Sequence, residues 1–181
     1  MTENDLIERA REGDREALDA LYRSHAGRVY TVVRRLTGDD AQAEDAAQET
    51  WLRAIRSLPA FRAEARFSTW IHRIAINCAL YGRRTRGRIR DREVDLPDTL
   101  TAMENGGRPL LRMSLQEAID DLPSGMRRVL VLHDIEGFTH EEIGTLLGIT
   151  AGTSKSQLYK ARAKVREQLR PKVEGRGLCS I

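Results

Sequence analysis

The chain has few of the residues that strand-rich, membrane-spanning and secreted proteins need. Aromatic residues make up only 5% of its 181 residues and 31% are charged, which favours a soluble, helix-rich protein over a β-sandwich. No apolar run approaches the roughly 20 residues of a membrane-spanning helix. Residues 1–6 are polar and acidic, unlike the start of a signal peptide. We therefore expect no membrane span and a cytoplasmic location.

Cysteine and the common catalytic motifs are also scarce. The two cysteines, Cys78 and Cys179, form no metal-binding spacing and no disulfide framework, and the four histidines add none. The sequence contains no glycine-rich phosphate loop, GxSxG elbow or HExxH motif. We therefore expect no metal, no cofactor and no enzymatic activity. Cys179 is expected to be exposed and open to oxidation, although no motif gives it a redox role.

Charge is plentiful but segregated along the chain. Residues 83–90 hold five arginines and no acid, and residues 114–142 hold seven acids against two arginines. Residues 153–172 reverse this balance, with seven bases against Glu167 alone. A basic helical element of this kind is an electrostatic footprint for phosphates. The alternative is a basic face that only contacts solvent.

The first part of the chain has the pattern of a helical bundle. Apolar residues return every three or four positions, as in amphipathic helices. The five predicted helices cover residues 6–10, 17–21, 29–36, 43–58 and 67–81. Asp14 is expected to cap the second helix, Gly38 to end the third, and Pro59 to follow the fourth. The fourth helix has an apolar stripe that includes Trp51 and Ile55. Together they predict one compact all-α domain.

A second helical part follows a stretch of different composition. Residues 83–113 contain proline and glycine but no sustained apolar stripe, which predicts a linker. Ser114 and Thr139 each precede a glutamate by three residues, the spacing of a capping box, and each is expected to start a helix. Ser124 is expected to cap another helix, and Thr150 to begin the last and longest one.

Residues 139–169 have the order of a helix-turn-helix: a short helix, a tight turn at Gly148 and a longer basic helix. In the longer helix Leu158, Ala161 and Val165 are expected to face inward. The side chains left to point outward near its start are Lys155, Ser156, Gln157, Tyr159 and Lys160. Lysine pairs with guanine and glutamine with adenine in the major groove. Farther along, Arg162, Lys164 and Arg166 suit phosphate contacts. The alternative is a helical hairpin with a solvated basic face.

Two longer runs resemble one family. HDIEGFTHEEIGTLLGITAGTSKSQLYKARAKVREQL is similar to region 4 of the extracytoplasmic-function (ECF) group of bacterial sigma factors, whose usual pattern is EGxSxEEIAxxLGxxxGTVKSRLxRARxxL. AEDAAQETWLRAIRSLPAFRAEARFSTWIHRIAINCALYGRRTR resembles region 2 of the same group, with its DxxQE core, LPxFR turn and FxTWxxRIAxN helix. The resemblance implies an all-α protein of two small domains. The predicted parts are region 2 at 1–88, a linker at 89–113, region 4 at 114–172 and a short tail at 173–181.

The resemblance also implies roles for individual residues. The set matching the helix that binds the β′ coiled coil of core RNA polymerase is Asp45, Gln48, Glu49 and Trp51. The set matching the region that captures a flipped base and backbone of the single-stranded −10 element is Phe61, Arg62, Phe67, Arg73, Asn77, Arg83 and Arg84. The five outward residues of the last helix match the positions that recognise the −35 element as duplex. The acidic linker at 91–104 resembles the segment that enters the polymerase channel.

The implied partners are core RNA polymerase, through its β′ coiled coil and β subunit, promoter DNA in duplex and single-stranded form, and an anti-sigma factor. Three positions depart from the family pattern. Ser154 replaces the usual valine, which predicts weaker packing of the recognition helix, and Gln157 replaces an arginine that would contact guanine or phosphate. Ala63 stands where glycine is common, so the base-capture loop is expected to differ in shape.

Two other classes of function stay open at this point. One is a stand-alone helix-turn-helix repressor or activator that binds operator DNA as a dimer. The other is an adaptor whose C-terminal hairpin binds a protein partner. Individual residues have structural alternatives too: Trp51 and Trp70 suit core anchors, and Asn77 suits a hydrogen-bonded core amide. The acidic DxxQE helix and the RIAIN segment favour the sigma factor, since a simple repressor needs neither.

Overall fold

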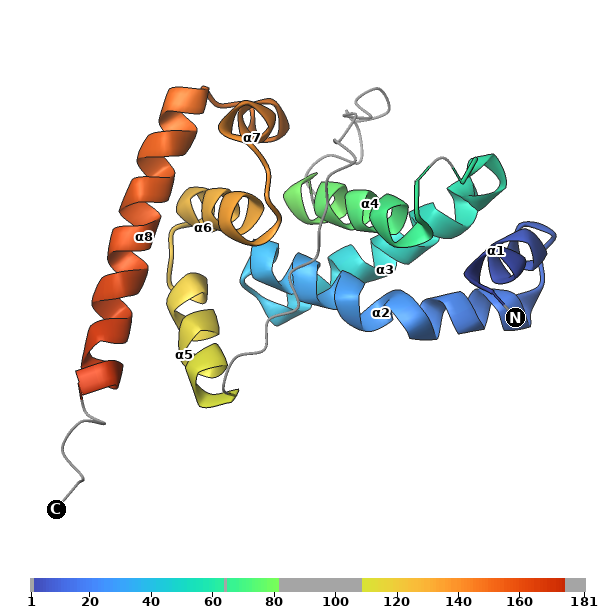
Figure 1. The fold of residues 1–181 in the computed structure, drawn as a ribbon, viewed down its shortest axis with the longest axis horizontal. Coiled ribbons are helices and arrows are strands. Elements are labelled where there is room, and N and C mark those ends of the chain that lie inside the picture. Colours follow the sequence, from blue (N-terminus) through green and yellow to red (C-terminus); the bar gives the residue numbers. More distant parts are fainter. Residues whose placement is uncertain (1, 64, 82–108, 175–181) are drawn as a thin grey trace, which may run out of the picture. The chain divides into compact units, whose positions relative to one another are not determined.

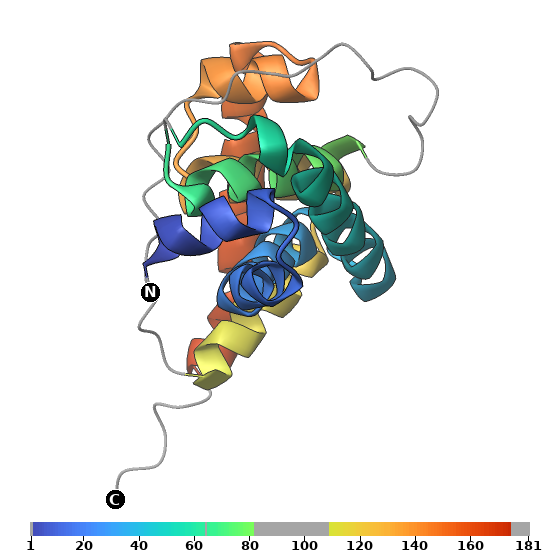
Figure 2. The same cartoon turned by 90° about the vertical axis from the view of Figure 1, so that its right-hand side faces the viewer.

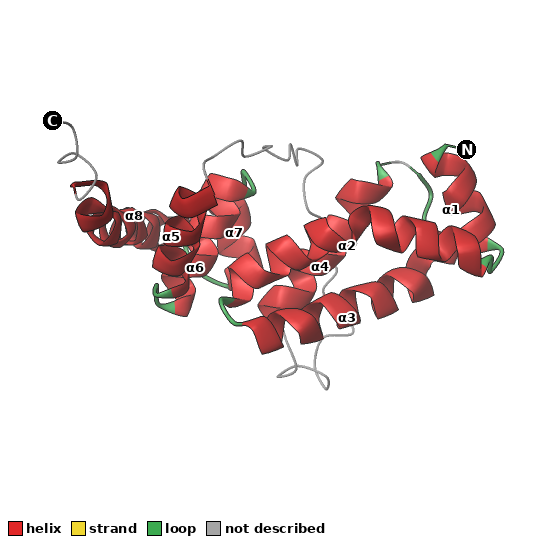
Figure 3. Cartoon of the chain, turned by 90° about the horizontal axis from the view of Figure 1, so that it is seen from below, coloured by secondary structure: helices red, strands yellow, loops and turns green. Residues whose placement is uncertain are grey.

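The described residues of this computed structural model are 2–63, 65–81 and 109–174. They form helices and loops without a strand (Figure 3), which confirms the predicted all-α fold for this part of the chain. The chain divides into two compact units, residues 1–92 and 93–181. Arg83, Arg84, the predicted acidic linker segment and Cys179 lie outside the described residues.

The first unit is a bundle arranged around one long helix. Its elements are α1 (Glu3–Arg11), α2 (Arg15–Thr37), α3 (Asp40–Ser57), the 3-10 turn η1 (Leu58–Ala60) and α4 (Phe67–Tyr81). Helix α2 packs against α1, α3 and α4, and α3 packs against α4 (Figure 1). Figure 2 shows α2 nearly end-on. Fully buried side chains at the centre include Leu21, Val33, Leu36, Ile71 and Ile76.

Local signals position the ends of these helices as predicted. Asp14 Oδ1 accepts hydrogen bonds from the backbone N–H groups of Glu16 and Ala17, which caps α2. Gly38 ends α2 with a φ of 71°, a left-handed conformation that glycine adopts without strain. The predicted break between residues 21 and 29 is wrong, because α2 runs through Gly27 without interruption. Gly27 lowers helix stability by about 1 kcal/mol, which the packed face of α2 offsets.

The second unit consists of short helices packed against a long C-terminal helix. Its elements are α5 (Pro109–Asp120), α6 (Ser124–Leu130), the π-helical turn η3 (Val131–Ile135), α7 (His140–Leu147) and α8 (Ala151–Glu174). Helix α8 packs against α5, α6 and α7. The buried core of this unit includes Ile119, Val129, Leu132, Ile143 and Leu146.

Four helix starts in this unit were predicted, and two are confirmed: Thr139 precedes α7 and Thr150 precedes α8. Thr139 caps α7 in a capping box with Glu142. Helix α5 begins at Pro109 rather than at Ser114, since proline suits the first turn of a helix, where its missing N–H has no intrahelical partner. Ser124 is the first residue of α6 and does not cap it. The π-helical turn η3 was not predicted, and its hydrogen bond from Glu136 N to Val131 O measures 3.0 Å.

Candidate nucleic-acid and polymerase interfaces

The helix-turn-helix is formed by α7, the turn at Gly148 and α8. Gly148 has a φ of 68° and ends α7 in the left-handed conformation, as predicted. The turn is tight, because a Cβ at Gly144 would lie only 2.7 Å from the carbonyl oxygen of Ile149. Thr150 Oγ1 accepts a hydrogen bond of 3.0 Å from the N–H of Thr153, which caps the start of α8.

The first turns of α8 present polar side chains to solvent. Leu158 and Ala161 are 4% and 0% exposed and hold α8 on the core, and Val165 is half-buried. Four of the five predicted outward residues are exposed: Lys155, Ser156, Tyr159 and Lys160. Tyr159 is 78% exposed, more than any other large hydrophobic residue in the described part of the chain. This group of four is called the α8 polar face below.

Gln157 is the exception, and the prediction that it points outward is wrong. It is half-buried, and its Oε1 is inaccessible to solvent and accepts no hydrogen bond from any described residue. The amide lies over Gly125 of α6, where an added Cβ would come 3.2 Å from Oε1 and 3.4 Å from Nε2. Glycine at position 125 therefore leaves the space that the side chain of Gln157 occupies.

Ser154 links the two helices of the motif by a polar contact. It is completely buried, and its Oγ lies 2.9 Å from Nδ1 of His140 in α7. The ring of His140 stacks on that of His133 at 4.5 Å. Burial, and then the positive charges of His133 and Lys155, lower the pKa of His140. The hydrogen bond thus supplies an α7–α8 link where the family pattern has an apolar valine.

Arg162 is held by the protein itself. Its Nε and Nη2 lie 2.9 Å and 2.6 Å from the two carboxylate oxygens of Asp134 in η3, a two-point ion pair. Burial alone would raise the pKa of Asp134, but hydrogen bonds from Arg162 and His133 lower it below its ordinary value. The bond to Asp134 raises the pKa of Arg162. Arg162 therefore has a structural partner within the unit, and its phosphate contact stays a prediction; like Lys164 and Arg166, it is exposed.

In the first unit, two of the predicted −10 residues, Phe61 and Phe67, belong to an aromatic cluster. Phe61 and Phe67 are 6% and 3% exposed, so they pack rather than present open faces. Trp70 is half-buried, with ring centroids 4.8 Å from Phe61 and 5.4 Å from Phe67, which fits its interpretation as a core anchor. His25 adds a fourth ring, 5.1 Å from Phe67. The rings of Phe61 and Phe67, with centroids 6.0 Å apart, bring together the end of η1 and the start of α4.

Ala63 in this loop adopts the left-handed conformation, with a φ of 55°. This backbone conformation costs an L-residue about 1–2 kcal/mol, and glycine adopts it freely. Ala63 thus adopts the conformation that glycine favours, at a cost in stability, and the expected difference in loop shape stays a prediction. Arg62, its neighbour, is exposed.

Asn77 and Arg73 lie on α4 and are both half-buried. The Oδ1 atom of Asn77 is buried and accepts no hydrogen bond within the described part of the chain. Most buried side-chain acceptors in proteins have a partner. Asn77 therefore does not behave as the hydrogen-bonded core amide that the sequence left open, and this favours a functional interpretation.

The acidic face of α3 carries the predicted polymerase-binding residues. Asp45 and Gln48 are exposed, whereas Glu49 and Trp51 are half-buried. Glu49 forms an ion pair of 2.8 Å with Arg53 of the next turn. Trp51 packs against Tyr22 of α2, with ring centroids 4.9 Å apart.

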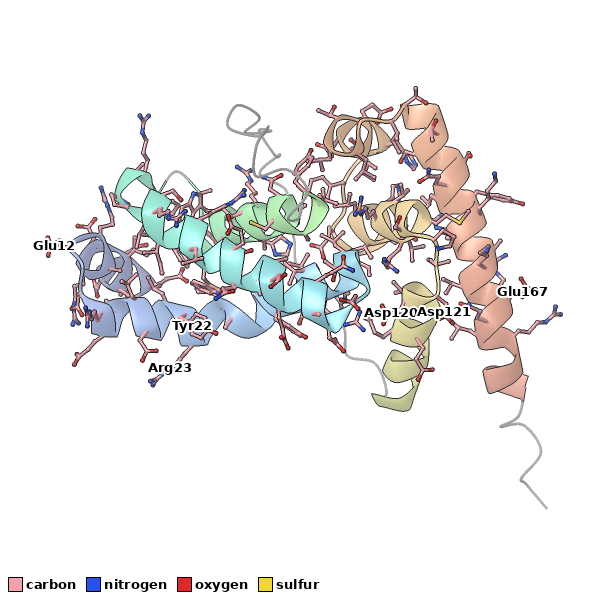
Figure 4. All side chains as sticks on the ribbon, turned by 180° about the vertical axis from the view of Figure 1, so that it is seen from behind. Glu12, Tyr22, Arg23, Asp120, Asp121 and Glu167 are labelled. Atoms are coloured by element: carbon pink, nitrogen blue, oxygen red, sulfur yellow. The ribbon has the colours of Figure 1, made fainter. Side chains whose placement is uncertain are left out.

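Three exposed apolar residues near Trp51 were missed. Tyr22, Leu52 and Ile55 are 49%, 43% and 49% exposed (Figure 4 labels Tyr22). Ile55 was expected in the inward stripe of its helix, but the buried positions of α3 are Ala43, Ala46, Thr50 and Ala54. The regular spacing of these small residues could have predicted that Ile55 faces outward. With Trp51 they form what we call the α2–α3 apolar patch.

No helix within the described ranges is both long and apolar enough to cross a membrane. Residues 2–63, 65–81 and 109–174 contain no group of three histidine, cysteine or acidic side chains placed to hold a metal ion. Cys78 carries a buried free thiol, and burial raises its pKa.

A helical bundle followed by a helix-turn-helix unit places the chain in the class of DNA-binding transcription proteins. Residues 21–89 match the family model of sigma-70 region 2, and residues 112–165 match that of sigma-70 region 4. The chain is 32% identical to the RNA polymerase sigma-H factor of Pseudomonas aeruginosa, over 92% of this chain and 93% of that one. It therefore belongs to the sigma-70 family of RNA polymerase sigma factors, in the ECF group.

Other relatives agree with this assignment. The ECF sigma factor SigE of Mycolicibacterium smegmatis is 39% identical over 87% of this chain, which spans 64% of that relative's length. CarQ of Myxococcus xanthus is 34% identical over 90% of this chain and 95% of its own. Among solved structures, the Bartonella quintana sigma factor RpoE, in complex with the anti-sigma factor NepR, is similar in fold. Its TM-score is 0.54 at 22% identity, over 84% of this chain and 96% of that one.

Proposed function

We propose that this chain binds core RNA polymerase, directs it to promoters with −35 and −10 elements, and favours the melting of promoter DNA. The protein acts as an initiation factor, and the polymerase supplies the catalytic metal and the nucleotide chemistry. Its place of action is the cytoplasm, where core polymerase works. The proposal depends on the ECF sigma-factor assignment and on the surfaces that the two units present.

The observation that carries the proposal is the α8 polar face. Buried Leu158 and Ala161 fix the helix, while Lys155 and Tyr159 stand clear of the core at its N-terminal end. A helix-turn-helix inserts this end of its second helix into the major groove, where lysine donates to guanine O6 and N7. We assign to this face the recognition of the −35 element as duplex.

We assign the −10 element to the first unit. Arg62 is exposed in the base-capture loop, and Arg73 and Asn77 are half-buried on α4, the helix that follows the loop. An amide and arginines near an aromatic cluster suit an unstacked base, which needs hydrogen bonds along its edge and cations at its phosphates. Phe61 and Phe67 are buried beside the loop and support it by packing. Arg83 and Arg84 complete the proposed set.

We assign core polymerase to α3 and the α2–α3 apolar patch. Asp45, Gln48, Glu49 and Trp51 match the family's β′-binding helix, and the exposed Leu52 and Ile55 extend it with apolar surface. In protein interfaces, acidic groups speed association with a basic partner, and apolar side chains that become buried supply much of the binding free energy. The complexes of related sigma factors with anti-sigma factors support a further partner of that class for this chain.

Transcription in vitro with purified core polymerase and a pool of promoter fragments tests the division of labour. Initiation is expected to require this chain. Asn77→Ala should retain upstream binding and lose promoter opening, whereas Lys155→Ala should lose upstream recognition. Initiation that does not depend on the chain, with tight duplex binding by it alone, would support the repressor alternative instead.

Binding to core polymerase is tested separately by equilibrium titration. Ile55→Ser removes an exposed apolar side chain from the α2–α3 apolar patch and is expected to weaken binding about tenfold. The matched control is Leu115→Ser, which removes a side chain that is 40% exposed in the other unit. Equal affinities for wild type and Ile55→Ser would contradict the assignment of this patch.

A further inference from the structure

Gln157 is the one member of the predicted DNA-reading set that the second unit turns toward its own core. Lys155, Ser156, Tyr159 and Lys160 are exposed, whereas Gln157 is half-buried against α6. Its position on α8 nevertheless lies within the run of residues that the proposed function assigns to the −35 duplex. The orientation of its amide therefore decides whether Gln157 can take part in base recognition.

The contact that holds Gln157 inward depends on a missing side chain. Residue 125 of α6 is glycine, and the amide of Gln157 lies over its Cα. An added Cβ there would stand 3.2 Å from Oε1, which is tighter than most real Cβ contacts, and 3.4 Å from Nε2. The amide is the far end of a flexible side chain, so alanine at this position would push it by a few tenths of an ångström and make the inward position less favourable.

The inward position of Gln157 leaves one of its polar atoms without a hydrogen bond within the described part of the chain. Oε1 of Gln157 is buried and accepts no hydrogen bond from the described residues, and an acceptor in this state costs stability. An adenine in the major groove offers the amide two hydrogen bonds, from its N6 amino group to Oε1 and from Nε2 to N7. The base would thus satisfy the atom that α6 leaves without a partner.

We propose that Gly125 is a specificity-determining residue of the helix-turn-helix: it lets Gln157 rest against α6 in the free protein, and a duplex with adenine at the matching position draws the amide out. The proposal rests on the proposed function, because it requires α8 to bind duplex DNA. Gly125 acts only through Gln157 and is a positioning residue. Promoter choice is then set jointly by a residue at the DNA surface and one behind it.

The test is selection of binding sites by the full chain from a duplex pool randomised over the upstream element, followed by titration of the selected duplexes. Four proteins are compared: wild type, Gly125→Ala, Gln157→Ala and the double variant. Gln157→Ala is expected to lose a preference for adenine at one position. Gly125→Ala should strengthen that preference about threefold, since it disfavours the inward state that competes with binding. The double variant should match Gln157→Ala.

Gly27→Ala is the matched control, because it makes the same replacement in a helix of the first unit where nothing lies within 4 Å of the added Cβ. It should leave base preference unchanged. The side-chain amide signals of Gln157 in nuclear magnetic resonance spectra of the free chain should shift in Gly125→Ala and not in Gly27→Ala.

The proposal is overturned if Gly125→Ala selects the same sites as wild type, if Gln157→Ala changes no base preference, or if the effect of Gly125→Ala persists without Gln157. Failure of the wild-type chain to select any duplex would overturn the −35 assignment itself, and the proposal with it. The first three outcomes leave that assignment intact, so the two failures are distinguishable.

Discussion

Phe67 of α4 and Tyr159 of α8 both belong to predicted DNA-binding sets, yet they are 3% and 78% exposed. In the first unit, the residues around the base-capture loop also form its aromatic core. In the second unit, the α8 polar face stands outside the core, which Leu158 and Ala161 supply. Substitutions at the first site should therefore change stability and function together, whereas substitutions at the second should change function alone.

The largest effect is expected at Phe67. Phe67→Ala removes a buried ring from the aromatic cluster and should lower the free energy of unfolding of the first unit by about 3–5 kcal/mol. Tryptophan fluorescence during urea unfolding measures this unit alone, because both tryptophans, Trp51 and Trp70, lie in it. Arg62→Ala, at an exposed position of the same loop, is the control and should change stability by less than about 0.5 kcal/mol. Equal losses in the free energy of unfolding for Phe67→Ala and Arg62→Ala would contradict a stabilising role of the aromatic cluster.

A smaller loss is expected inside the helix-turn-helix. Ser154→Ala removes the hydrogen bond to His140 and should destabilise the second unit by about 1 kcal/mol. Ser156→Ala, two residues away on the α8 polar face, should have an effect within about 0.5 kcal/mol. Circular dichroism follows both variants, since it reports all helices. A neutral Ser154→Ala would contradict a stabilising α7–α8 link.

A gain in stability is expected at Ala63. Ala63→Gly relieves the left-handed strain but adds flexibility to the unfolded chain, so the net gain should be about 0.5–1 kcal/mol. Ala60→Gly, nearby in η1 with an ordinary backbone, should lose a similar amount. The fluorescence assay for Phe67→Ala serves here as well. The free energy of unfolding should rise in Ala63→Gly and fall in Ala60→Gly. A fall in both variants would contradict backbone strain at Ala63.

The smallest effect is a dependence on pH in the second unit. The pKa of His140 is lowered from its ordinary 6.5 on folding, so the unfolded state binds the proton more readily. The free energy of unfolding of the second unit is therefore highest above pH 6.5, where His140 is neutral in both states. It falls as the pH drops through this value toward the folded pKa. His140→Gln keeps a hydrogen-bonding group and should flatten the profile between pH 7.5 and 5.5. An unchanged profile in His140→Gln would assign the dependence to another group.

Much of this fold follows from local sequence signals. Asp14, Gly38, Thr139 and Gly148 set helix ends by chemistry that operates within a few residues, and all four predictions are confirmed. The errors arose where packing outweighs a local signal. Gly27 does not break α2, because its neighbours in the helix pack on three others.

In the candidate sites, too, local sequence signals predicted some side-chain orientations and missed those that depend on distant contacts. The exposure of Lys155 and Tyr159 followed from the helical period, because Leu158 and Ala161 fix the inward face. The inward turn of Gln157 did not, since it depends on Gly125, which lies far away in the sequence. The pairing of Arg162 with Asp134 depends likewise on the unpredicted π-helical turn. Contacts between residues distant in the sequence therefore set the orientation of these two side chains, which helical periodicity alone does not predict.

Transcription from a premelted promoter tests the division of labour most directly. The template carries a mismatched bubble at the −10 element and an intact −35 duplex, and it is transcribed by core polymerase with wild type, Asn77→Ala or Lys155→Ala. If the first unit acts by capturing melted DNA, the bubble should restore initiation by Asn77→Ala to a large degree and leave the defect of Lys155→Ala unchanged. Equal rescue of both variants, or of neither, would contradict two units that act on two forms of DNA.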